Sequence, residues 1–306
     1  TLQQPGVGFP LARIGVLFSL SVGSVLDFAI CKWKGKFQSE LGLLRTMFDA
    51  FSPGDILLTD RYLCCHREIA VLKSRGVDTV ARMHSQRRVD FRRGRKLGLT
   101  DHIVLWDKPL CPDWMSPEEY ALLPDTMPIR ELRYQIAEPG FRVTEIVLAT
   151  TLLDAEAYPA DELAELYALR WDAEINLRSL KDLMQMDVLR GHSPEMVKKE
   201  IWAHLLAYNL IRTVIAQAAA KHGLSPRNIS FKRAMRSVEQ FRSTLASAPK
   251  SDLASIYETL LDLIASHQIG ERPGRTEPRQ VKRRPKPYKR MTTPRDHARK
   301  HSKYER

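Results

Sequence analysis

The sequence predicts an α/β protein that carries a β-rich insertion and ends in a group of helices. Strand-like and helix-like segments alternate over residues 1–84. Residues 85–142 are short segments rich in arginine, proline and tryptophan, and helical periodicity dominates from residue 159 onward. Hydrophobic residues make up 43% of the 306 residues, which is ample for a buried core.

The first part of the chain predicts a hairpin followed by alternating helices and strands. The expected elements are a β-hairpin within 12–35, a helix at 39–51, a strand at 56–59, a helix at 65–74 and a strand at 77–84. Ser39 is a suitable N-cap, and Gly76 ends the second helix. Asp60 follows the buried strand directly, at the end where α/β sheets present functional groups.

The second half begins with a strand and continues as helices. The expected elements are a strand at 142–153, a helix opened by Pro159 and Asp161, and helices at about 194–222, 231–246 and 251–266. We therefore expect a core in two parts, at 1–84 and 143–268, a β-rich insertion at 85–142, and a tail at 269–306.

The charge is concentrated at the C-terminus. The whole chain has a net charge of +12, and the residues from Gly270 to Arg306 hold 14 Lys/Arg and 4 Asp/Glu, which is a net of +10. This proline-containing tail is too polar to bury a core, so we expect it to be disordered and to contact a polyanion such as DNA. A solubilising end without a partner is the simpler alternative.

The sequence argues against a membrane protein and against a zinc-finger protein. No run of about 18 apolar residues occurs, so we expect no membrane span. The four cysteines lack the paired spacing of a zinc site and read as incidental thiols of a reducing compartment.

One predicted helix carries an unusual polar line. At about 100° per residue, Tyr167, Arg170, Glu174 and Lys181 fall within roughly 60° of one another around a continuous helix. Together with Asp60, Glu174 could hold a hard cation such as Mg²⁺, because one or two carboxylates with water and substrate phosphate are its usual ligands. Taken alone, the two acids are weak evidence, because an Asp at a strand end more often belongs to a turn or an ion pair and a helix Glu beside Arg is usually solvated.

The spacing Y-x(2)-R-x(3)-E-x(6)-K resembles the signature helix of the insertion sequence 4 family of DDE transposases. The segment "PGDILLTDRYLC" looks like the family's strand that carries the second catalytic Asp. The resemblance extends to "PGVGFPLARIGVLFSLSVGSVLD", "RRVDFRRGRKLG", "MVKKEIWAHLLAYNLIR" and "VKRRPKPYKRMT", and so covers nearly the whole chain.

The resemblance implies a ribonuclease H-like fold, two Mg²⁺ or Mn²⁺ ions, and cleavage and strand transfer of transposon-end DNA in the bacterial cytoplasm, with a homodimer on paired ends. Asp60 and Glu174 would be catalytic metal ligands, whereas Tyr167, Arg170 and Lys181 would contact DNA near the cleaved bond. The arginine-rich segment is expected to contact phosphates through Arg87, Arg88, Arg92, Arg93 and Arg95; a solvated loop is the alternative.

The sequence departs from the family pattern at its start. No Asp precedes Asp27, which itself matches a later family strand, so the family's first catalytic Asp has no counterpart in this sequence. We therefore expect an N-terminally truncated transposase, lacking the first strand of its core and poorly active. The alternatives are a catalytically inactive DNA-binding remnant and, judged from tail composition alone, a basic RNA-binding protein.

Overall fold

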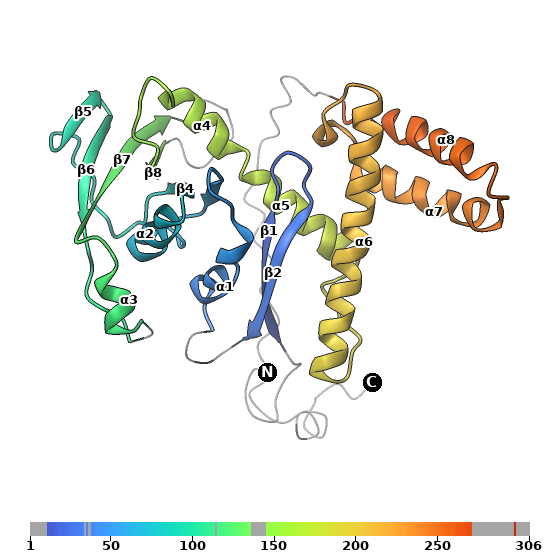
Figure 1. Cartoon of the computed structure of the whole chain (residues 1–306), viewed down its shortest axis with the longest axis horizontal. Coiled ribbons are helices and arrows are strands. Elements are labelled where there is room, and N and C mark those ends of the chain that lie inside the picture. Colours follow the sequence, from blue (N-terminus) through green and yellow to red (C-terminus); the bar gives the residue numbers. More distant parts are fainter. Residues whose placement is uncertain are drawn as a thin grey trace, which may run out of the picture. The chain divides into compact units, whose positions relative to one another are not determined.

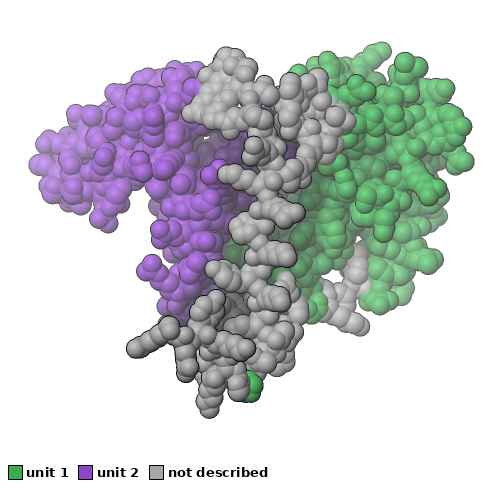
Figure 2. Space-filling view, turned by 180° about the vertical axis from the view of Figure 1, so that it is seen from behind, with its two compact units in different colours: residues 1–16, 27–167, 276–306 green, residues 17–26, 168–275 purple. Residues whose placement is uncertain are grey.

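The chain folds into a mixed α/β structure (Figure 1). The computed structural model describes residues 11–33, 35, 38–113, 115–135, 145–270 and 297. Two compact units are found, which Figure 2 colours separately: among the described residues, unit 1 holds 11–16, 27–167 and 297, and unit 2 holds 17–26 and 168–270. All of the tail predicted at 269–306, apart from 269, 270 and His297, lies outside the described residues.

The predicted hairpin is confirmed. Strands β1 (Ala12–Phe18) and β2 (Val25–Lys32) form a two-stranded sheet. The connecting turn is closed by the Ser19 N–H, which donates to the Ser24 carbonyl at 2.9 Å. Gly23 sits in this turn at φ +81°, a backbone conformation that favours glycine.

The alternating elements that follow are confirmed as well. They are α1 (Glu40–Thr46), the short 3₁₀ helix η1 (Phe48–Ala50), β3 (Ile56–Thr59), α2 (His66–Ser74) and β4 (Asp78–Arg82). The Ser39 hydroxyl accepts a hydrogen bond from the Gly42 N–H, as the predicted N-cap requires. Strands β3 and β4 pair in parallel through the helix α2 crossover.

Unit 1 is built on a six-stranded sheet with the order β3-β4-β8-β7-β6-β5. The further elements are β5 (Arg95–Gly98), β6 (Asp101–Asp107), α3 (Pro117–Ala121), β7 (Thr126–Gln135) and β8 (Glu145–Thr150). All pairings other than β3–β4 are antiparallel. Because β7 pairs with β8, the β-rich segment predicted at 85–142 contributes its strands to the same sheet as β3 and β4.

Neighbouring residues along a strand of the sheet belong to two different hydrophobic clusters. Ala81 of β4 belongs to one cluster with Ile69 of α2, whereas its neighbour Val80 belongs to the other with Leu163 of α4 (Ala160–Ala168). Successive side chains of a strand point to opposite faces, so α2 and α4 cover opposite faces of the sheet.

The helix expected to hold the polar line is not continuous, and that prediction was wrong. It consists of α4 (Ala160–Ala168), α5 (Trp171–Arg178) and a π-helical segment, η2 (Ser179–Leu183), with a turn at Leu169 and Arg170. A π turn also changes the rotation per residue. The calculated angles between the four signature residues therefore do not apply.

Unit 2 contains the predicted C-terminal helices. They are α6 (Pro194–Lys221), η3 (Pro226–Asn228), α7 (Phe231–Ser247) and α8 (Leu253–Ala265). Ser193 caps α6 by accepting a hydrogen bond from the Met196 N–H. Helix α8 packs on both α6 and α7. Within the described part of the chain, no helix is long and apolar enough to cross a membrane.

Candidate functional site

Asp60 directly follows strand β3, as the sequence predicted. Thr59 before it is buried, whereas Asp60 is exposed. Its Oδ1 accepts hydrogen bonds from the backbone N–H groups of Tyr62 at 2.9 Å and Leu63 at 3.3 Å. This local turn fixes the direction of the carboxylate. An oriented, exposed carboxylate at a strand end suits a hard divalent cation.

Glu174 lies on helix α5 with its carboxylate half-exposed. Its Oε1 accepts from Nη2 of Arg170 at 3.3 Å, one helical turn earlier. The Arg170 guanidinium lies 5.4 Å from the ring centre of Trp171. The structure thus brings together one acid and one cation of the predicted signature, and both belong to unit 2.

The other two signature residues have different surroundings. Tyr167 is 7% exposed and packs in the unit 1 cluster that contains Val80, Leu132 and Leu163. Lys181 lies in the π-helical segment η2 and is exposed. Burial of Tyr167 means that its ring is part of the core, so a role in stacking on DNA has less support than a role for its hydroxyl.

The predicted metal site consists of two acids in different units. Asp60 belongs to unit 1 and Glu174 to unit 2, so their joint action as metal ligands stays a prediction. No group of three or more His, Cys, Asp or Glu side chains that could hold a metal ion occurs among the residues described. Two carboxylates fit the ligand chemistry of Mg²⁺ or Mn²⁺, with water and phosphate oxygens completing the shell.

The arginine-rich segment is exposed, as expected of a phosphate-contacting surface. Arg87, Arg88, Arg92, Arg93 and Arg95 are all exposed. Asp90 lies among them and accepts from Nε of Arg92 at 2.8 Å. Hydrogen bonds from Arg92 lower the pKa of Asp90 to about 2, so this carboxylate stays ionised and offsets part of the positive charge.

A buried polar group behind this segment was not found from the sequence. Glu131 of β7 accepts from the Trp106 indole N–H at 2.7 Å and lies 3.1 Å from Nε2 of His102. Nδ1 of His102 lies 2.7 Å from the carbonyl oxygen of Arg93. These contacts attach the arginine-rich segment to the sheet. Their sequence signal was the polar residues His102 and Glu131 at buried strand positions.

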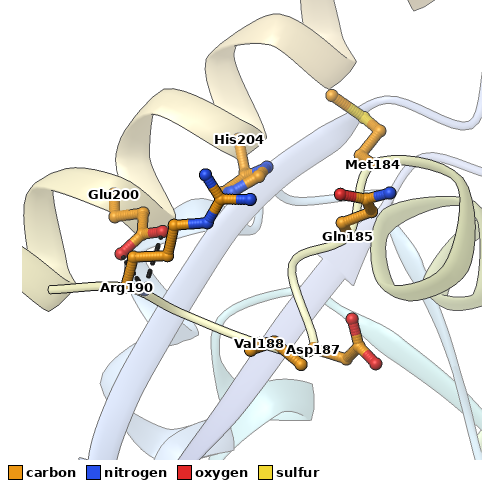
Figure 3. A pocket seen from close by; sticks show the side chains of 7 residues that line it. All are labelled: Met184, Gln185, Asp187, Val188, Arg190, Glu200 and His204. Atoms are coloured by element: carbon orange, nitrogen blue, oxygen red, sulfur yellow. Dashed lines mark hydrogen bonds between the residues drawn. The ribbon is translucent and has the colours of Figure 1, made fainter.

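A pocket of about 420 Å³ follows the signature segment in unit 2 (Figure 3). It is lined by Met184, Gln185, Asp187, Val188, Arg190, Glu200 and His204. Both Glu200 carboxylate oxygens accept from the Arg190 N–H, at 3.0 and 2.9 Å, and Oε2 also accepts from the Gly191 N–H at 2.9 Å. These backbone hydrogen bonds lower the pKa of Glu200.

A second buried network lies on the far side of α5 from Glu174 and was likewise missed. Asn176 is fully buried and bonds to Arg212 of α6 and to Arg227 of η3. The sequence signal that could have indicated it is Arg212 within the mostly apolar stretch "LLAYNLIRTVIA" of α6.

Comparison with known proteins gives a family. A family model described as "Transposase DDE domain" matches residues 9–210. The transposase InsG for insertion sequence element IS4 of Escherichia coli (strain K12) is 37% identical over 147 residues, which are 46% of this chain and 33% of that protein. The putative transposase InsL for IS186A of the same strain is 35% identical over 102 residues, 32% of this chain and 28% of that protein.

These matches cover part of each relative. The chain spans about a third of the length of the curated relatives that it matches. Among solved structures, a piggyBac transposase in a synaptic complex with hairpin DNA is similar with a TM-score of 0.44 and 11% identity, over 88% of this chain and 54% of that chain.

Proposed function

The chain belongs to the transposase DDE domain family, as an insertion sequence 4-type member, and we propose that it cleaves DNA at the ends of its element and joins the cut strands to a target. The observation that carries this proposal is the pairing of Glu174 with Arg170 in a chain whose residues 9–210 match the family. An acid with an adjacent cation suits chemistry in which negative charge builds up on a phosphate.

Asp60 and Glu174 are the proposed ligands of the divalent ions, Mg²⁺ or Mn²⁺. When bound in such a site, two ions activate the attacking oxygen and stabilise the leaving oxygen of a phosphodiester. The protein's own part is to present oriented carboxylates, and Asp60 is oriented by the N–H groups of Tyr62 and Leu63. Arg170, Lys181 and the hydroxyl of Tyr167 are proposed to contact the DNA beside the cleaved bond.

The core is proposed to be ribonuclease H-like, with residues 1–84 and 143–268 as its two parts and 85–142 as an insertion. The hairpin β1–β2, the parallel pair β3–β4 with its α2 crossover, and the acid at the end of β3 support this assignment. Carboxyl ends of parallel strands are where open α/β sheets bind their ligands.

DNA is the proposed partner of the exposed arginine-rich segment. Exposed arginines outnumber the single acid among them, and phosphate contacts of this kind position a duplex without reading its sequence. The net charge of +10 from Gly270 onward adds a second basic region. We also propose that the protein acts on bacterial DNA in the cytoplasm, as a dimer that holds the paired ends.

A second candidate function is DNA binding without cleavage. The arginine-rich segment does not depend on metal ligands for its exposure or charge. Binding would therefore persist in a chain that cannot cut.

The test is a nicking assay with duplex DNA that carries the ends of the element, in Mg²⁺ or Mn²⁺. We expect Glu174→Gln and Asp60→Asn each to lower the nicking rate about 10³-fold, because each removes a charged metal ligand. Matched controls are Glu165→Gln on α4, an exposed glutamate, and Asp125→Asn, whose side chain is 98% exposed.

The outcomes separate the two candidates. Nicking by Glu174→Gln at the wild-type rate would overturn the metal-ligand assignment. Specific binding of end DNA with no nicking in either metal would support the DNA-binding alternative. Neither binding nor nicking would overturn both.

A further inference from the structure

Asn176 connects helix α5 to the buried Arg212 and the half-buried Arg227 in unit 2. Its Oδ1 accepts from Nη2 of Arg212 at 2.7 Å and from Nη1 of Arg227 at 3.1 Å. Guanidinium groups only donate, so this oxygen must face both of them and the amide orientation is fixed. Asn176 is 0% exposed, and Arg212 is 4% exposed.

The two arginines in turn hold the tip of the β1–β2 hairpin. Arg227 donates from Nη2 to the Ser19 carbonyl at 3.0 Å and from Nε to the Leu20 carbonyl at 2.5 Å. Gly23 lies against both guanidiniums: a Cβ placed there would be 2.7 Å from Nη1 of Arg227 and 3.0 Å from Cζ of Arg212. A side chain at this position would therefore require a guanidinium group to move.

Helix α6 fixes the same tip from a second direction. The Tyr208 hydroxyl accepts from Nε of Arg212 at 2.9 Å and donates to the Gly23 carbonyl at 2.7 Å. The Asn209 side chain forms two hydrogen bonds with the backbone of Val25: it accepts from the Val25 N–H at 2.8 Å and donates to the Val25 carbonyl at 2.9 Å. The hairpin tip is thus bonded to α6 and η3, and Arg212 and Arg227 of these elements in turn bond to Asn176 of α5.

The face of α5 that carries Asn176 and meets the two arginines is opposite to the face that carries Glu174. Asn176 follows Glu174 by two residues, which is about 200° around a helix. Asp172, one turn before Asn176, lies 3.7 Å from Nε of Arg227 and adds a second attachment on the same face. Asn176 is buried while the Glu174 side chain is 49% exposed.

We propose that Asn176, with Arg212 and Arg227, is a positioning residue that fixes the rotation of α5 about its axis and so aims Glu174 and Arg170 outward together. This inference rests on the proposed function of Glu174. Two cations share one amide oxygen, so removing that acceptor leaves one donor of the buried Arg212 and one donor of the half-buried Arg227 without a partner. A helix that is released on this face can rotate, and Glu174 moves with it.

The test compares two substitutions of nearly equal size. Asn176→Leu removes the acceptor, whereas Asn176→Asp keeps it and adds a negative charge between the two cations. In the nicking assay we expect Asn176→Leu to lower kcat about 10²-fold, because a catalytic group that is misplaced by about 1 Å has an effect of this size. We expect KM for DNA to stay within about twofold of wild type. Asn176→Asp is expected to keep kcat within about threefold.

A readout that does not need activity accompanies this assay. Hydrogen exchange of the α5 amides should be faster in Asn176→Leu and unchanged in Asn176→Asp. Gln240→Leu, at an exposed amide residue of α7, is the matched control and should change neither kcat nor exchange in α5. Should Asn176→Leu not fold, Arg227→Lys keeps the charge but loses the planar fork, and we expect about a tenfold loss of kcat.

Each outcome decides the inference. Unchanged kcat in Asn176→Leu together with lower thermal stability would show a purely structural role and overturn the proposal. Equal losses in the Leu and Asp variants would overturn the shared-acceptor argument. If the wild-type chain binds but does not nick DNA, the proposed function fails, and exchange in α5 still decides whether Asn176 fixes this helix.

Discussion

Nη2 of Arg170 lies 3.3 Å from Oε1 of Glu174 across the start of helix α5. Arg170 is the N-cap residue of α5, yet its φ of −54° and ψ of −30° are helical, so the four-residue spacing to Glu174 still places the two side chains together. An ion pair as exposed as this one contributes at most about 1 kcal/mol to stability. Its importance therefore lies in presenting a cation beside a candidate metal ligand.

Replacing Arg170 should slow DNA nicking without unfolding the protein. We expect Arg170→Ala to lower the nicking rate about 10²-fold to 10³-fold, the usual effect of removing one group that stabilises transition-state charge. Arg170→Lys should lose less, because the charge remains while the planar fork is lost. The matched control is Arg178→Ala, which removes an ion pair of the same spacing between the last residue of α5 and Asp182 of η2, at 3.3 Å. Equal losses in Arg178→Ala would contradict this role.

Tyr167 should show separate effects of its ring and its hydroxyl. Because the residue is 7% exposed, Tyr167→Ala should destabilise unit 1 by about 3–5 kcal/mol in urea unfolding. Tyr167→Phe keeps the ring, so its stability should stay within about 1.5 kcal/mol of wild type, while nicking falls about tenfold through loss of one bond to a phosphate. Wild-type nicking by Tyr167→Phe would mean that Tyr167 acts through packing alone.

Most element positions followed from local sequence signals. Ser39 caps the helix that it was expected to cap, the helix expected from about residue 194 begins at Pro194, and the apolar runs on either side of Gly23 formed the hairpin. These signals act over a few residues, so the sequence carries them directly. Asp60 at the end of β3 was predictable for the same reason.

The break between α4 and α5 was not predictable in this way. Leu169 and Arg170 are neither glycine nor proline, and the turn separates a residue packed in unit 1, Tyr167, from one bonded in unit 2, Asn176. Tertiary contacts override helix propensity here. Helix α6 gives a related case, because it exposes Leu206 and buries Arg212, the reverse of what residue type indicates.

The arginine-rich segment should set part of the salt dependence of DNA binding. If Arg88 and Arg95 each contact a phosphate, the double Ala variant should reduce the slope of log K against log salt by about 1.8, or 0.9 per contact. Arg87 is left in place because its guanidinium lies 3.7 Å from the Trp106 ring centre and supports packing. Removing Arg233 and Arg236, exposed on α7, is the control for net charge. The same change of slope in that control would contradict a specific surface.

Glu200 should make the segment before α6 sensitive to acid. Hydrogen bonds from the N–H groups of Arg190 and Gly191 lower its pKa below the ordinary value of 4.5. A lowered carboxylate pKa stabilises the folded state at pH values above the ordinary range, and this contribution is lost as the pH falls through the folded pKa. The Gly191 amide resonance should therefore titrate below about pH 4.5 in wild type and not in Glu200→Gln. Titration of Gly191 in that variant would contradict the assignment.

Glu131 offers a test of how the arginine-rich segment is held. Its Oε1 accepts from the Trp106 indole and its Oε2 faces Nε2 of His102, so each oxygen has its own partner. A glutamine can match both: its carbonyl accepts from the indole, and its NH₂ donates to Nε2 while Nδ1–H still donates to the Arg93 carbonyl. We therefore expect Glu131→Gln to cost less than about 1.5 kcal/mol in urea unfolding.

Glu131→Ala removes the acceptor altogether. The indole N–H and the imidazole are then left buried without their partner, and we expect a loss of about 3–5 kcal/mol. Since the imidazole also meets the Arg93 carbonyl, faster hydrogen exchange in β5 should accompany this loss and should be absent in Glu131→Gln. Equal destabilisation by Gln and Ala would mean that the negative charge of Glu131, rather than its two acceptor positions, holds the segment on the sheet.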